Sequence, residues 1–419
     1  MYRFCFVCLA CICLALGTAV SAGAWGLPGE SDTYFLGYET EVNMQYGGRS
    51  VESLVGLNCR LARLTFPIKE DYHIWAPLWE VPTGILASTM QHEINGHGSR
   101  AREFDLAPGY GIGLDLSFFT YINNAPASNE QVIYLSAAGT ESNTVLSHNL
   151  VKDGLAAKRF RAAKYPLLYA SKLDFSLYCF LTPKPRDSES DRKDFNKMYE
   201  EGNDIAIYLA SRQAQRKNSN PVALWERDYS IDYHENLLQE NWRDVQNTAV
   251  WHLLDPAAWS FLYPYIRGHA IQGETYIRPL MLELGGGYGL SIGTRGALGP
   301  SLVTRFLDLY LSTPVGLGTL YVRDLDSSVD RTYGLGAGLH NLELGKYARF
   351  SLQGDVWETP DSEEQLYEGS KGNISGELGF TTPLGLGMTA KLGWKSRGFL
   401  PGKPVGKGLY MGLGATYRF

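Results

Sequence analysis

Residue type alternates with period two through the C-terminal third of the chain. From Leu409 to Phe419 every second residue is apolar or aromatic, and the residues between them are mostly glycine or polar. The same alternation covers 384–395 and 348–356. Because successive side chains of a strand point to opposite faces of its sheet, this period predicts strands with one apolar face and one small or polar face.

The links between these strands alternate in length. Short turns at 313–316 and 382–385 alternate with longer polar links at 324–331, 358–372 and 396–407. Short turns on one rim and long loops on the other are typical of a transmembrane β-barrel, and the frequent glycine (46) and tyrosine (26) residues fit that class. A soluble antiparallel sandwich also alternates and is the competing interpretation. Strands are expected near 278–294, 301–312, 316–323, 332–340, 347–357, 373–382, 384–395 and 408–419.

The N-terminal part adds further candidate strands. Residues 34–46 alternate in the same way, and a weaker strand is expected over 55–65. This hairpin would close against the last strand, which gives a transmembrane antiparallel barrel of about ten strands, with eight or twelve as alternatives. The glycine-rich segment Gly285–Gly289 is expected to lie inside a strand, where it would let the sheet bend.

The middle of the chain has a different character. Residues 68–275 change to helical periodicity and carry most of the charge, with helices expected over 86–102, 131–160, 194–217 and 241–266. The sequence therefore predicts an α+β protein, a barrel with a large helical insert. The expected segments are a signal peptide (1–22), N-terminal barrel strands (23–67), the helical insert (68–275) and the C-terminal barrel (276–419).

The start of the chain indicates export. Arg3 precedes an apolar run from Phe4 to Leu16, and small residues follow as far as Ala22. The run is shorter than the ~20 residues of a membrane span, so we expect a signal peptide cleaved after Ala22. Cys59 and Cys179 remain in the mature chain and could pair in an oxidising compartment. The net charge of −6 argues against nucleic acid as a partner.

The segment His92-Glu93-Ile94-Asn95-Gly96-His97 holds the residue types of a catalytic metal site. Two imidazoles and a carboxylate can hold zinc and deprotonate a water bound to it. The histidines stand at i and i+5, which on an ideal α-helix places them about 140° apart. A one-residue π-bulge at Asn95-Gly96 would return both to one face, and such bulges favour functional sites.

This segment resembles the His-Glu-x-x-Gly-His motif of the dipeptidyl peptidase III family of zinc peptidases. In that family the histidines bind zinc, the glutamate between them is the general base, and a glutamate on a later helix is the third ligand. The resemblance implies that His92 and His97 are Zn²⁺ ligands and that Glu93 is the base. It covers six residues. That family is soluble, it is not a barrel, and its second motif of paired glutamates has no counterpart here.

The third ligand is open. Glu141 is preferred, because the small residues around it would let its helix approach the motif closely. Glu103, His148 and Asp255 are the alternatives. Asp255 forms an i, i+3 pair with His252, although an Asp-Pro step also reads as a helix break.

The last three residues, Tyr417 to Phe419, resemble the C-terminal signal by which bacterial barrel proteins are recognised for outer-membrane assembly. That resemblance implies an outer-membrane location, with the lipid bilayer and the barrel-assembly machinery as partners.

Taken together, these features predict an outer-membrane zinc metallopeptidase that hydrolyses peptide or protein substrates, with Glu93 as general base. Two alternatives are open. One is a lipid acyl hydrolase or deacylase with the same site. The other is a non-enzymatic barrel, a pore or an adhesin, whose insert is a plug and whose histidines are structural.

Overall fold

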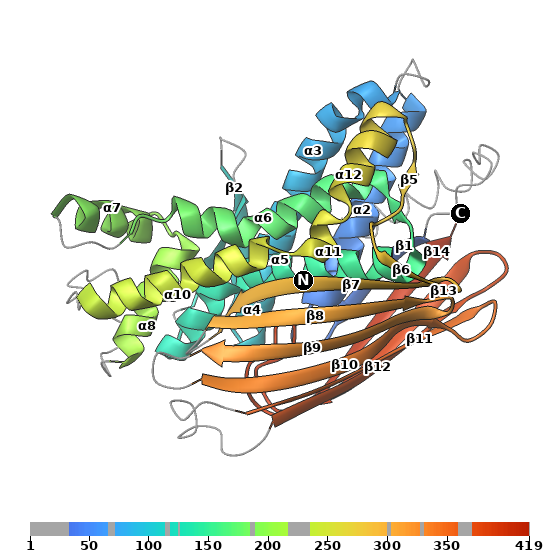
Figure 1. The fold of residues 1–419 in the computed structure, drawn as a ribbon. Coiled ribbons are helices and arrows are strands. Elements are labelled where there is room, and N and C mark those ends of the chain that lie inside the picture. Colours follow the sequence, from blue (N-terminus) through green and yellow to red (C-terminus); the bar gives the residue numbers. More distant parts are fainter. Residues whose placement is uncertain are drawn as a thin grey trace.

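The structure, a computed structural model, describes residues 33–65, 72–113, 118–124, 126–184, 189–216, 235–299, 303–326, 331–358 and 371–418. A ten-stranded antiparallel sheet forms a curved trough, and the helices lie on one side of it (Figure 1). The expected signal peptide and Phe419 lie outside the described residues.

The strands of the large sheet are β1 (Thr33–Glu39), β6 (Leu282–Gly285), β7 (Tyr288–Leu298), β8 (Val303–Thr313), β9 (Gly316–Asp326), β10 (Arg331–Glu343), β11 (Ala348–Trp357), β12 (Lys371–Thr381), β13 (Leu386–Lys395) and β14 (Gly408–Arg418). Two small antiparallel pairs lie outside it: β2 (Pro108–Ile112) with β3 (Phe118–Ile122), and β4 (Phe160–Arg161) with β5 (Tyr276–Ile277).

The helices are α2 (Met44–Thr65), α3 (Tyr72–Met90), the π-helix η1 (Gln91–His97), α4 (Gly98–Glu103), α5 (Asn129–Ala157), the 3₁₀-helix η2 (Ala162–Lys164), α6 (Tyr165–Leu181), α7 (Glu189–Glu200), α8 (Asp204–Arg216), α10 (Glu235–Leu253), α11 (Pro256–Trp259), α12 (Leu262–Pro264) and the π-helix η3 (Tyr265–Ile271). No helix in the described ranges is both long and apolar enough to cross a membrane.

The sheet confirms the predicted antiparallel architecture and its ten strands, and it corrects the expected closure. Its order begins with β1-β14 and ends with β7-β6, so β1 and β6 are edges and the described strands do not close into a barrel. The N-terminal strand does pair with the last strand, as predicted, with Tyr34 opposite Tyr417.

The expected second N-terminal strand is wrong, because residues 55–65 form the second half of helix α2. Val51, Val55 and Cys59 are buried along one side of this helix. A spacing of four residues places side chains on one face of a strand as well as on one face of a helix. Alternation therefore did not distinguish the two in this segment.

The glycine-rich segment is also corrected. Gly285, Gly286 and Gly287 have φ angles of 85°, 59° and 79°, and they form the turn between β6 and β7. Glycine adopts this left-handed conformation without the steric cost that other residues incur. The single strand expected over 278–294 is therefore a hairpin, which supplies the tenth strand in place of the missing N-terminal one.

The two faces of the sheet have the opposite polarity to that of a soluble protein. On β8, Leu307 and Leu309 are exposed on the outer face. Phe306, Asp308 and Tyr310 are buried between the sheet and the helices. An apolar outer face and a polar inner face are the arrangement of strands that face lipid outside and a filled lumen inside.

One ion pair connects the sheet to helix α2, and a second connects two strands of the sheet. Arg49 of α2 donates to Glu377 of β12 (2.8 Å), and Lys391 of β13 donates to Glu39 of β1 (2.5 Å). The side chains of Lys391 and Glu39 are buried, and buried charges are tolerated only when they are paired. Cys59 and Cys179 are buried and form no disulfide with each other.

Candidate metal centre

The helix that carries the His-Glu-x-x-Gly-His segment is continuous from α3 through η1 to α4. Met90 before η1 and Gly98 after it both keep right-handed helical angles. Within η1 the backbone takes the π-helical form, which confirms the expected π-bulge. Since the π-helix bonds residue i to i+5, His92 and His97 lie on the same face, with ring centroids 4.9 Å apart.

Two glycines let this segment pack closely on α5. A side chain at Gly139 of α5 would collide with the imidazole of His92, and one at Gly96 of η1 would collide with the Ala138 carbonyl. The small residues around Glu141 therefore do let α5 approach the motif, but the residue that faces it is Gly139.

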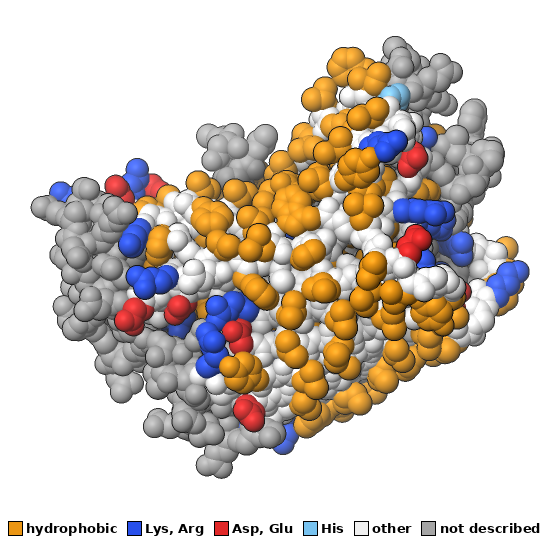
Figure 2. Space-filling model, viewed as in Figure 1, with side chains coloured by type: hydrophobic (Ala, Val, Ile, Leu, Met, Phe, Trp, Pro, Cys, Tyr) orange, Lys and Arg blue, Asp and Glu red, His pale blue; other side chains and the backbone are white. Residues whose placement is uncertain are grey.

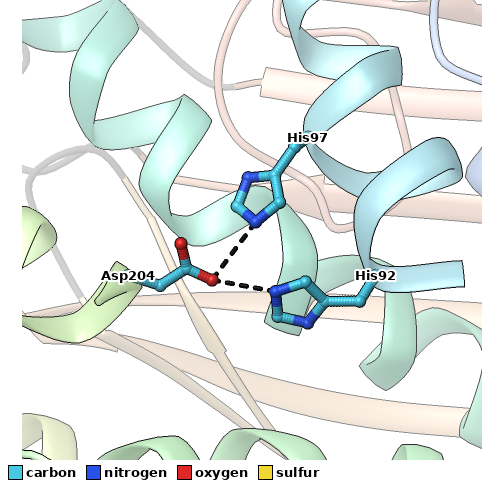
Figure 3. Close-up of side chains that lie close together, drawn as sticks. All are labelled: His92, His97 and Asp204. Atoms are coloured by element: carbon cyan, nitrogen blue, oxygen red, sulfur yellow. Dashed lines mark hydrogen bonds and ion pairs between the residues drawn. The ribbon is translucent and has the colours of Figure 1, made fainter. Parts of the chain in front are cut away.

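Asp204 completes a cluster with the two histidines. Its Oδ2 lies 2.9 Å from His92 Nε2 and 3.2 Å from His97 Nε2 (Figure 3). Asp204 is the first residue of α8, and the Asn203 side chain caps this helix by accepting from the Ala206 N–H. His92, His97 and Asp204 form the one group in the described chain whose ligand atoms converge closely enough to hold a metal ion.

The other nitrogen of each histidine is also engaged. His97 donates Nδ1–H to the Leu135 carbonyl (2.7 Å), and His92 Nδ1 lies 3.0 Å from the Asp174 carboxylate. Acceptors at Nδ1 leave Nε2 to face a cation, as is usual for metal-binding histidines. Tyr178, one turn after Asp174 on α6, stacks on the His92 ring at 5.0 Å between centroids.

The pKa shifts of the cluster favour protonated histidines and an ionised Asp204. Burial alone would lower the pKa of His92, but the Asp174 and Asp204 carboxylates raise it well above its ordinary value. For His97, burial again opposes Asp204, which raises the pKa. Burial would raise the pKa of Asp204, but the two imidazoles hold it below its ordinary range. A buried carboxylate and two imidazoles in mutual contact suit replacement of two protons by one divalent cation.

Glu93 lies beside this cluster. It is buried on η1, and its carboxylate is close enough to His97 to contribute to the raised pKa of that imidazole. Its backbone carbonyl accepts from the Thr120 hydroxyl of β3 at 2.9 Å, which ties η1 to the β2–β3 hairpin. Glu93, the general base expected from the sequence, is therefore buried on the same π-helix as His92 and His97, outside the group of converging ligand atoms.

The preferred third ligand, Glu141, is not among them. Its carboxylate binds Arg100 through two contacts (3.1 and 2.5 Å) and accepts the Gly402 N–H at 2.7 Å. Two residues along a helix correspond to a rotation of about 200°, so with Gly139 facing His92, Glu141 points to the other side of α5. There it fixes α4 and the loop after β13.

The alternative ligands are also placed elsewhere. Glu103 binds Arg100 (2.6 Å), and His148 Nδ1 lies 3.2 Å from the Tyr310 hydroxyl. Asp255 binds Lys172 (2.7 Å) and caps α11, so the Asp-Pro step is a helix break as suspected. His252 accepts the Gly296 N–H at 3.1 Å.

No protein-family model and no curated protein matches this chain. The solved structure of OccAB3 from Acinetobacter baumannii is similar to 33% of this chain, with 14% sequence identity and a TM-score of 0.24. The match spans 46% of that protein, less than half of its length. A similarity of this extent defines neither a fold nor a function for the chain.

Proposed function

We propose that this protein is a zinc-dependent hydrolase of the bacterial outer membrane, and specifically a metallopeptidase. The convergence of His92 Nε2, His97 Nε2 and Asp204 Oδ2 on one point carries the proposal. Two imidazoles and one carboxylate are the protein ligands of several catalytic zinc sites, which keep a further position open for water or substrate.

The same ligand set also suits non-haem iron. Glu93 favours hydrolysis, because it is buried on the same π-helix as the two histidines and a carboxylate near a metal can accept a proton from water. A bound zinc would lower the pKa of that water and polarise the substrate carbonyl.

In this mechanism Glu93 takes a proton as the water oxygen bonds to the carbonyl carbon. Glu93 then delivers the proton to the amide nitrogen as the C–N bond breaks, which leaves one carboxylate and one amine product. Asp174 and the Leu135 carbonyl orient the two imidazoles throughout.

The outward apolar face of the sheet supports the membrane location. Leucines at alternate positions of β8 are exposed, while the charged and aromatic residues between them are buried. Antiparallel strands with this polarity are those of outer-membrane proteins, which supports the outer membrane as the location.

A second candidate, a hydrolase that acts on lipid acyl bonds, has one observation in its favour. Helix α6 presents Asp174 and Tyr178 to the metal cluster and exposes Leu177 and Phe180 on its other side. The site is therefore one helix away from an apolar surface. Release of fatty acid without cleavage of any peptide would favour this candidate.

The first test is metal content, measured by elemental mass spectrometry on detergent-extracted protein. We expect one zinc per chain in the wild type and its loss in Asp204→Asn, which removes a ligand charge. Glu201→Gln is the matched control, since Glu201 is an exposed acidic residue just before the same helix and should keep the metal. Iron in place of zinc, or equal metal in both variants, would contradict the proposal.

The second test is turnover. Glu93→Gln should keep the zinc and lower kcat by roughly 10²–10⁴-fold, the usual contribution of a general base. Hydrolysis of a peptide library, read by mass spectrometry, measures it. Undiminished turnover in this variant would exclude Glu93 as the base.

A further inference from the structure

Helix α3 has its polar and apolar faces reversed relative to a helix on the surface of a soluble protein. Its only Asp, Glu, Lys or Arg residue is Glu80, which is 1% exposed and contacts His269 Nε2 at 3.0 Å. Six of the apolar side chains exposed on the helix are Ile74, Trp75, Leu78, Trp79, Ile85 and Leu86. An exposed apolar face of this size marks an interaction surface.

Helix α6 repeats this reversal. Its charged residues, Lys172 and Asp174, point inward to Asp255 and His92. Leu177, Phe180 and Leu181 are about half exposed or more, at 49%, 51% and 67%. The two helices pack on each other, so their exposed side chains belong to neighbouring parts of one surface.

The large sheet has the same polarity, with leucines outward and charged residues inward. Helices pack at both of its edges: α2 packs on β1, and α10 and α11 pack on β7, the neighbour of edge strand β6. The helices therefore flank the opening that an unclosed sheet leaves.

Figure 2 shows how the two apolar surfaces relate. Hydrophobic side chains cover the sheet and continue over the helices, and most charged side chains in this view lie toward its left and right sides. A belt of apolar side chains between two charged rims is the surface of a protein that sits in a bilayer.

We propose that α3 and α6 complete the wall that the sheet leaves open, with their outer faces against the acyl chains of the bilayer. The proposal rests on the membrane location in the proposed function and adds a helical face to the lipid-facing surface. Acyl chains are the favoured occupant because the face continues the outer face of the sheet, and because the described residues of α3 and α6 expose no Asp, Glu, Lys or Arg side chain on it. Trp75 and Trp79 add indoles, which are enriched where bilayers meet water.

The test uses nitroxide side chains on the full protein in phospholipid vesicles. Leu78→Cys and Ile85→Cys report on α3, Leu309→Cys on the outer face of the sheet, and Lys197→Cys on an exposed site of α7. Electron paramagnetic resonance measures collisions of each label with oxygen, which concentrates in lipid, and with a polar nickel chelate. The unmutated chain gives the background from Cys59 and Cys179, which are buried.

We expect labels at 78 and 85 to collide severalfold more with oxygen than with the nickel chelate, like the label at 309 and opposite to the one at 197. Preference for nickel at 78 and 85 would mean that water covers the face. Low collision with both reagents would mean that a protein segment or a second copy covers it. Either result overturns the proposal.

The label at 309 separates this inference from the proposed function. If that label also prefers nickel, the membrane location fails as a whole. If 309 prefers oxygen and 78 and 85 do not, only the helical wall fails. The zinc content of every labelled protein reports that the metal centre is intact.

Discussion

His92 and His97 each use Nδ1 for an acceptor inside the protein, so those acceptors should control how well Nε2 binds a metal. Asp174 is the acceptor for His92 at 3.0 Å, and it is the one that can be changed by mutation, since the acceptor for His97 is a backbone carbonyl. Such outer contacts fix the ring orientation and raise the basicity of the ligand nitrogen.

Asp174→Asn should therefore weaken zinc binding by roughly 10- to 100-fold without changing the stoichiometry. Competition against a chromophoric chelator measures the affinity. Glu201→Gln, exposed near the start of α8, serves as control and should bind like the wild type. An unchanged affinity in Asp174→Asn would show that the charge of Asp174 does not contribute to metal binding.

The raised pKa values of His92 and His97 give zinc binding a definite pH dependence. In the metal-free protein both imidazoles keep their protons above the usual pKa of about 6.5, and each must lose one to bind the metal. Asp204 is already ionised, because its pKa is lowered. Acidification below the raised histidine pKa values therefore weakens binding, and alkalinisation above them has no further effect.

Zinc titrations across neutral pH should show an apparent affinity that falls as the pH is lowered. The fall should be about tenfold per pH unit for one displaced proton and about 100-fold for two. Isothermal titration in two buffers of different ionisation enthalpy would count the protons released. Release of no protons at neutral pH would contradict the raised pKa values.

The sequence predicted the two histidines of the site and the π-helix that carries them, but it did not predict Asp204. The i, i+5 spacing of the histidines required a π-turn, so η1 was predictable from two residues and helix geometry. Asp204 was not, because one of 44 acidic residues, over a hundred positions from the motif, carries no local pattern of its own. Its one signal is the helix-capping Asn203 before it, which marks a helix start and no ligand.

At the scale of elements, strands β8 to β14 were predictable because each alternates over ten residues or more. A helix does not produce period two over that length. Helix α2 was not, since its buried residues at spacing four fit a strand as well. The β6–β7 hairpin depended on three consecutive glycines with positive φ, which a sequence pattern does not distinguish from a flexible strand.

Glu141 joins α4 and α5 through Arg100, so we expect it to stabilise the fold and not to bind the metal. Arg100 and Glu141 both have side chains that are 0% exposed, and their pair also anchors the loop after β13 through Gly402. Glu141→Gln leaves the Arg100 charge buried with less compensation, and it should lower the free energy of unfolding by about 3–5 kcal/mol.

Chemical denaturation and zinc content, measured on the same sample, test this assignment. Glu141→Gln should be destabilised with its zinc retained, whereas Asp204→Asn should lose zinc. Loss of zinc from folded Glu141→Gln would return Glu141 to the ligand set.

At the scale of the whole molecule, the position of α6 links the metal centre to the surface. One side of this helix holds His92 through Asp174, and the other exposes Leu177 and Phe180. If that outer side faces lipid, a substrate held in the bilayer is concentrated close to the site, which lowers the entropic cost of bringing the reactants together.

A peptide with an acyl anchor in vesicles should then be cleaved faster than the same peptide free in solution. Initial rates at equal bulk concentration test this, with Glu93→Gln as the inactive control for both forms. Equal rates would show that the site is reached from water, and that the apolar side of α6 serves only to hold the protein in the membrane.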